Sequence, residues 1–180
     1  MNKLITTIAC LICCIVYTQA QNKDNMLSKK EQSIAAISMY AARGNQDSLK
    51  VILARGLDCG LTVSEEKEVL TQLYAYCGFP RSMGALVTLM NLTKERAAQG
   101  IKDEAGREPS PVKSSDMFVV GGQNQLKLFG RPALGEVLTF APALDQFLKA
   151  HLFGDIFSRD NLDWRTVNCL LWLPCRCWTA

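Results

Sequence analysis

EVLTQLYAYCGFPR, residues 68–81, contains the end of one helical pattern and the start of the next. Apolar side chains in its first half recur at the three- and four-residue spacing of one helix face, and Gly78 ends that pattern. Pro80 suits the first turn of a new helix, where its missing amide hydrogen would have no partner in any case. Helices joined by so short a turn are expected to pack antiparallel. This stretch therefore predicts an all-α fold.

Helix signals continue on both sides of this stretch. Capping boxes of the form Ser/Thr-x-x-Glu begin at Ser28 and Thr62, and Gly44 and Gly60 are typical helix stops. The sequence predicts helices over about 29–43, 46–60, 62–78 and 80–100. We expect them to form an antiparallel helical bundle that occupies residues 21–100.

The pattern weakens after residue 100. Gly, Pro, Ser and charged residues accumulate around EPSP at 108–111, so residues 101–139 are predicted to be a linker or arm. Val119 and Val120 are compatible with a short extended piece, but two residues do not establish a strand. From Phe140 to Phe157 apolar residues return at helical spacing, which predicts one further amphipathic helix.

The N-terminus is typical of an export signal. Lys3 precedes an apolar stretch over residues 4–17, and the small residue Ala20 stands before a plausible cleavage point. We expect a signal peptide over residues 1–20 and a periplasmic or secreted mature protein without stable membrane insertion. An uncleaved anchor is the alternative, although the apolar stretch is shorter than the roughly 20 residues of a spanning helix. The formal net charge of +3 is small, so we expect no nucleic-acid partner.

Cysteines do not define a disulfide framework. Removing residues 1–20 leaves an odd number of them, at Cys59, Cys77, Cys169, Cys175 and Cys177. The Cys-x-Cys pair near the C-terminus is spaced too closely for the usual zinc or redox loop, and His151 is the single histidine. We therefore expect no metal site.

Three runs of sequence together suggest a family. They are LSKKEQ at 27–32, GLDCGLT at 56–62 and EVLTQLYAYCGFPR at 68–81, and their combination resembles the carboxymuconolactone decarboxylase family, part of the AhpD-like superfamily. The resemblance implies an all-α fold. It also implies a homo-oligomer in which helical hairpins of neighbouring subunits close the active sites.

The resemblance continues over residues 140–166, which are similar to the start of a second family repeat. The expected continuation is absent. In its place stands an aberrant tail, residues 167–180, rich in Trp and Cys, which indicates either a shifted reading frame or a genuine truncation.

Two chemistries compete within this family. The branch that resembles alkylhydroperoxidases needs a Cys-x-x-Cys pair followed by His, and the corresponding residues 44–52 contain neither. The decarboxylase branch needs a cation for the substrate carboxylate and a group that protonates carbon. Arg81, after Gly78-Phe79-Pro80, is the predicted substrate-binding residue.

Glu68, Tyr76 and His151 are the predicted catalytic residues. Histidine is the residue type whose unperturbed side chain changes charge near neutral pH, which favours His151 as a proton donor, although its apolar helix face also favours a core histidine. Glu68 has a structural alternative, because a Glu in the first half of a helix is stabilised by the helix dipole. Tyr76 is equally compatible with a buried tyrosine that only forms a hydrogen bond to a neighbour. Cys77 and Cys59 are weaker candidates for a redox role, because buried cysteines are commonly inert.

The sequence thus favours an exported, cofactor-free carboxymuconolactone decarboxylase-like enzyme for a small acidic or lactone-type substrate. A non-catalytic or decayed oligomeric family member is the alternative, and a thiol redox protein is a weaker one.

Overall fold

The computed structural model describes residues 27–112, 116–131 and 135–163, and every regular element within these ranges is helical. This confirms the all-α prediction. The predicted signal peptide, residues 1–20, and the tail at 167–180 lie outside the described residues. None of the described helices is long and apolar enough to cross a membrane.

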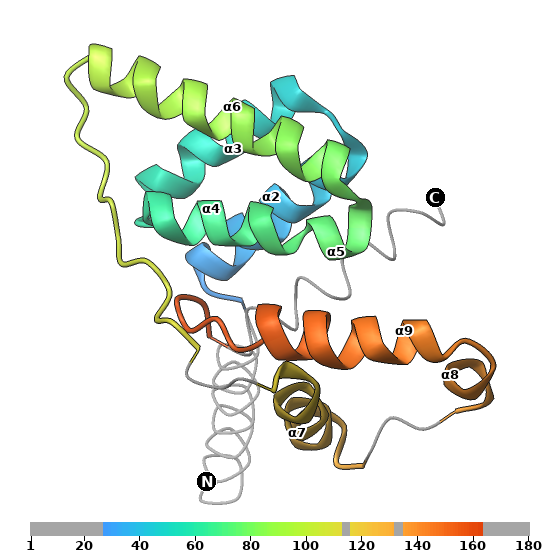
Figure 1. The fold of residues 1–180 in the computed structure, drawn as a ribbon. Helices are drawn as coiled ribbons and strands as arrows, with labels where there is room; N and C mark the ends of the chain where they lie inside the picture. The colour runs from blue at the N-terminus through green and yellow to red at the C-terminus, as the bar shows by residue number, and fades with distance from the viewer. Residues whose placement is uncertain (1–26, 113–115, 132–134, 164–180) are drawn as a thin grey trace, which may run out of the picture.

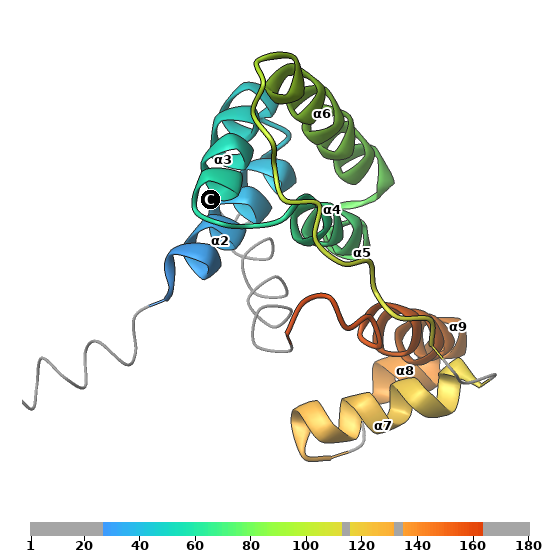
Figure 2. The same cartoon turned by 90° about the vertical axis from the view of Figure 1, so that its left-hand side faces the viewer.

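The helices form two groups (Figure 1). The first group contains α2 (Lys29–Arg43), α3 (Gln46–Asp58), α4 (Val63–Gln72), α5 (Tyr74–Cys77) and α6 (Phe79–Ala98). The second contains α7 (Met117–Phe129), α8 (Glu136–Phe140), α9 (Pro142–Gln146) and the π-helix η1 (Phe147–Ile156). An irregular segment runs from the end of α6 down to α7 along the side of the molecule (Figures 1 and 2).

The predicted capping boxes are present. The Ser28 hydroxyl accepts a hydrogen bond from Glu31 N at 3.2 Å, and the Glu31 carboxylate accepts one from Ser28 N at 2.7 Å. Thr62 and Glu65 repeat this exchange at the start of α4, at 3.1 and 2.7 Å. Because these bonds satisfy amides that a helix leaves unpaired, they fix where α2 and α4 begin.

The predicted third helix is interrupted. Tyr76 N and Cys77 N both donate to Leu73 O, at 3.0 and 2.9 Å, so the chain tightens at Leu73 and separates α4 from α5. Gly78 follows with φ 81°, a conformation that favours glycine, and α6 then starts at Phe79 with Pro80 in its first turn. The stop and restart predicted at residues 78–80 are therefore confirmed.

One hydrophobic core joins both groups. Its fully buried centre is aliphatic and comes from α2, α3, α4 and α6, as in Ile37, Leu49, Leu70 and Leu89. Phe153 and Phe157, from the second group, are buried against the same cluster. The second group therefore packs on the bundle and is not an independent arm.

Residues 101–112 form a strap across the start of α4. Val63 N and Ser64 N donate to Glu104 O and Ala105 O, both at 2.9 Å, and the Ser64 hydroxyl donates to Arg107 O at 2.6 Å. The Glu104 and Ala105 carbonyls thus satisfy the first two amides of α4, which no helical bond can reach. The irregular backbone predicted here is observed, but the strap is held in place.

The predicted linker also contains helices, which corrects the prediction for residues 117–129 and 136–140. Asp116 caps α7 by accepting a hydrogen bond from Val119 N at 3.1 Å. Gly121 is buried where α7 meets η1, and a Cβ there would collide with Lys149 O. The absence of a side chain at Gly121 therefore allows the backbones of α7 and η1 to approach closely.

The helix predicted over 140–157 is present in two forms, α9 and then η1. The side-chain amide of Asn124 on α7 donates to Phe153 O at 2.7 Å, which gives one η1 carbonyl a partner outside its own helix. The expectation of a core histidine is wrong, because the His151 side chain is 51% exposed.

Candidate functional site

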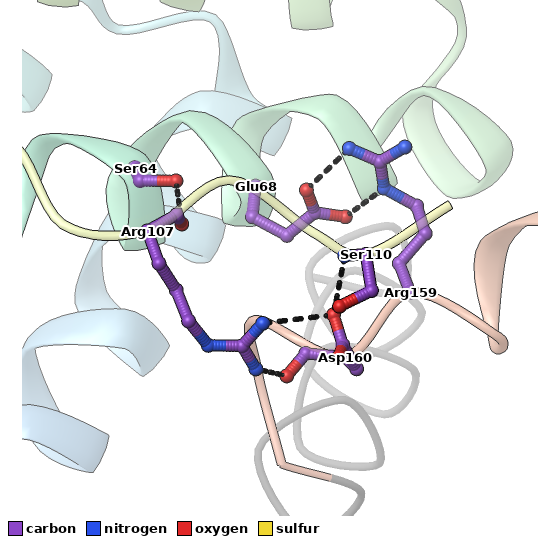
Figure 3. Close-up of polar contacts among 6 residues, drawn as sticks. All are labelled: Ser64, Glu68, Arg107, Ser110, Arg159 and Asp160. Atoms are coloured by element: carbon purple, nitrogen blue, oxygen red, sulfur yellow. Dashed lines mark hydrogen bonds and ion pairs between the residues drawn. The ribbon is translucent and has the colours of Figure 1, made fainter. Parts of the chain in front are cut away.

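Glu68 lies in the second half of α4 and is only 2% exposed. Arg159, which follows η1, donates to both of its carboxylate oxygens, from Nε at 2.6 Å and from Nη2 at 2.8 Å. Gln72, one turn further along α4, donates to Oε1 at 3.0 Å. Figure 3 shows the fork of the Arg159 guanidinium facing the carboxylate.

These bonds decide the charge of Glu68. Burial alone would raise its pKa, but the hydrogen bonds from Arg159 and then Gln72 lower the pKa below its ordinary value. The partner charge in turn raises the pKa of Arg159. Glu68 is therefore an ionised group with both oxygens occupied, which suits an anchor between α4 and the turn after η1 better than a proton donor.

A second ionic contact ties the strap to the same turn (Figure 3). Arg107 donates to Asp160 Oδ1 at 3.0 Å and also to the Asp160 carbonyl, while Ser110 N donates to Asp160 Oδ1 at 2.8 Å. These donors, the Ser110 amide first, lower the pKa of Asp160 to about 2. The turn that follows η1 is thus fixed both to α4 and to the strap.

Fixing this turn positions η1 against α5. The ring of His151 lies 5.6 Å from the ring of Tyr74, and Tyr74 stacks on Phe79 at 4.5 Å. His151 Nδ1 lies 2.8 Å from Asp155 Oδ2, one turn further along η1. The fold therefore joins an imidazole, its carboxylate partner and an aromatic pair from three elements, although they are far apart in sequence.

Two further predicted site residues, Arg81 and Tyr76, are close in sequence to Tyr74 and Phe79. Arg81 is exposed in the first turn of α6, two residues after Phe79, and its guanidinium approaches Gly44 at the end of α2. Tyr76 is partly buried on α5. Tyr74, and not the predicted Tyr76, packs on His151. Two residues apart on a helix, these tyrosines point to different faces, and sequence alone does not show which of them faces His151.

The two described cysteines are free thiols in different surroundings. Cys77 is buried and donates to Leu73 O at 3.1 Å, and burial raises its pKa. Cys59 is partly buried at the end of α3. Within the described ranges, no group of three or more His, Cys, Asp or Glu side chains is arranged to hold a metal ion.

Residues 16–89 match the model of the carboxymuconolactone decarboxylase family. This segment is therefore similar to the family that the sequence motifs resemble. No curated protein matches the sequence. The family match includes Glu68, Tyr76, Arg81 and both described cysteines, and it ends within α6. The second repeat proposed for residues 140–166, which holds His151, lies beyond it and stays a prediction.

Proposed function

We propose that this protein is an exported, cofactor-independent enzyme of carboxymuconolactone decarboxylase type that acts on a small acidic or lactone substrate. The contact of His151 with Asp155 and Tyr74 carries the proposal, because it supplies an oriented imidazole beside an aromatic surface. Export rests on the signal-peptide pattern of residues 1–20.

His151 is the proposed proton-transfer group. An imidazole changes charge near neutral pH, and a carboxylate bound at Nδ1 fixes the tautomer that leaves Nε2 to exchange a proton with substrate. Asp155 is in place for that role. Loss of carbon dioxide from a β-keto or vinylogous acid leaves an enol or enolate, which must be protonated at carbon, and an imidazolium can donate that proton.

Arg81 is the proposed carboxylate-binding group. Its guanidinium is exposed and is carried by the same helix turn as Phe79, and guanidinium groups bind carboxylates through paired hydrogen bonds. Glu68 is assigned a positioning role. Its pairing with Arg159 ties the turn after η1 to α4, and this holds η1 beside α5.

The proposal is tested with the mature chain, starting at Gln21, and carboxymuconolactone as the probe, following carbon dioxide release. We expect His151→Gln to lower kcat by at least about a hundredfold, the lower range for losing a general acid. Asp155→Asn should lower kcat less, because an amide oxygen can still accept a hydrogen bond from Nδ1. Lys50→Gln, at an exposed ion pair with Glu95, is the control. Full turnover by His151→Gln would contradict the proposal.

A non-catalytic oligomeric family member is the second candidate, favoured by one observation. Several large apolar side chains of α6 and of the second helix group are exposed, among them Met83, Val87, Phe140 and Phe147. Such a surface is typical of association. A stable oligomer without turnover on the lactone and related keto acids would favour this candidate. The raised pKa of Cys77 disfavours the thiol redox alternative.

A further inference from the structure

A cavity of about 330 Å³ lies between α2 and α3, apart from the His151 cluster. Its walls include Ala36 and Ile52 as apolar surface, with Lys29 and Arg55 as charged groups and Cys59 at its border. A volume of this size is at the lower end of small-molecule sites, which are commonly apolar with a few polar groups.

The charged side chains that line this cavity have no counter-charge among its described lining residues. Lys29 and Arg55 are its two charged lining residues, and within the described ranges neither is part of an ion pair. Among the described residues, no acidic side chain lines it. Two cations that face the same small space repel each other and attract an anion.

Two other cavities show the contrast. The one beside the strap is lined by Lys67 and Glu108, which form an ion pair with each other. The one under the start of α2 is lined by Lys30 and Glu65, whose charged atoms lie 3.5 Å apart. In both, the protein itself supplies the counter-charge, whereas the α2–α3 cavity lacks it.

We propose that the α2–α3 cavity binds a small organic carboxylate, with its anionic group between Lys29 and Arg55 and its short apolar part against Ala36 and Ile52. This site is separate from the proposed active site and does not depend on the proposed reaction. The bound anion lies beside the Cys59 thiol, which makes that thiol a local reporter of the cavity.

The first experiment compares alkylation of Cys59 by iodoacetate and by iodoacetamide, resolved by peptide mass spectrometry. The two reagents transfer similar groups to the thiolate and release iodide, but only iodoacetate is an anion. We expect each of Lys29→Gln and Arg55→Gln to lower the iodoacetate-to-iodoacetamide rate ratio about fivefold at low salt. Lys94→Gln and Arg131→Gln remove the same charges from exposed positions that do not line the cavity, and should leave the ratio nearly unchanged.

The second experiment uses the unaltered chain, so it does not depend on the variants folding. Succinate or butyrate should protect Cys59 from iodoacetamide in a saturable manner, and Lys29→Gln with Arg55→Gln should abolish the protection. Inorganic phosphate serves as the purely ionic comparison and should protect less than butyrate at equal ionic strength. The proposal fails if no carboxylate protects Cys59, or if the cavity variants and the control variants change the rate ratio equally.

Discussion

Glu66 brings a carboxyl group into a fully buried position on α4, where one of its oxygens packs against the backbone of Gly56. Within the described residues, neither oxygen has a hydrogen-bond partner. Burial first, and the charge of Asp103 second, raise its pKa to about 9. Arg96 does not neutralise it, because its guanidinium is bound to Asp103 and Asp58.

This pKa predicts how stability depends on pH. The folded chain holds the Glu66 proton up to about pH 9, whereas the unfolded chain releases it near the ordinary glutamate pKa of 4.5. Stability from this group is therefore fully present below 4.5 and is lost as pH rises toward 9, with a slope of at most about 1.4 kcal/mol per pH unit.

Glu66→Gln should remove that slope, because the amide is neutral at every pH. Urea unfolding at pH 5 to 8.5 measures it, and the variant should gain stability relative to the unaltered chain as pH increases. Glu95→Gln, at an exposed ion pair, is the control and should leave the slope in place. Parallel pH curves for Glu66→Gln and the unaltered chain would refute the prediction.

The pair of Glu68 and Arg159 predicts an asymmetry between its two members. Arg159→Met leaves a carboxylate that is 2% exposed without its main counter-charge, and should cost roughly 3 kcal/mol. Glu68→Gln leaves a guanidinium that is 35% exposed and can reach water, so it should cost about 1 kcal/mol. Chemical denaturation of both variants at pH 7 measures the difference. Equal losses would show that the buried carboxylate is not the costly partner.

At the scale of the helical elements, local signals predicted α2, α3, α4 and α6, because their caps and stops lie within a few residues of the helix ends. The start of α2 is fixed by the capping box between Ser28 and Glu31, which are only three residues apart in sequence. Local signals were not sufficient at Gly121, which lies in the segment predicted to be a linker. A glycine in sequence indicates either a helix stop or a close helix contact, and only the position of η1 shows that Gly121 serves the second role.

The neighbouring glycines of α7 test this contact. Gly121→Ala places a methyl group against Lys149 O and should destabilise the protein by about 1–3 kcal/mol, the range for overpacking. Gly122→Ala meets no atom within 4 Å and should stabilise it by up to about 1 kcal/mol through helix propensity. Thermal unfolding followed by circular dichroism should shift in opposite directions. Shifts of the same sign and size would mean that α7 and η1 are not in close contact.

At the scale of the whole molecule, the candidate site depends on contacts that no local pattern contains. Arg159 and Glu68 are 91 residues apart, and Arg107 and Asp160 are 53 apart. The family resemblance and side-chain chemistry pointed to Glu68, Arg81 and His151, but only the folded chain places Tyr74 beside His151 and pairs Glu68 with Arg159. The roles of these residues therefore depend on contacts between distant segments, which local sequence patterns do not contain.

The surface of α6 leads to the last prediction. Phe79, Met83, Val87 and Met90 are 47–62% exposed and follow one another at helical spacing, so they form an apolar stripe along one face. We expect this stripe to be an interface between copies of the chain, because an apolar face of this length is unusual on a monomer. Since Phe79 also stacks on Tyr74, such an interface would border the His151 cluster.

Met83→Glu with Val87→Glu should shift the protein toward monomer and at the same time lower turnover, because burying two carboxylates at an interface is costly. Sedimentation velocity measures the first effect and lactone turnover the second. Val51→Glu introduces the same charge at a single exposed valine on α3, outside the stripe, and should change neither. If the double variant keeps its oligomeric state while Val51→Glu loses it, the interface lies on α3. If both variants and the unaltered chain sediment as monomers, the stripe does not mediate self-association, and the active site must form within one chain.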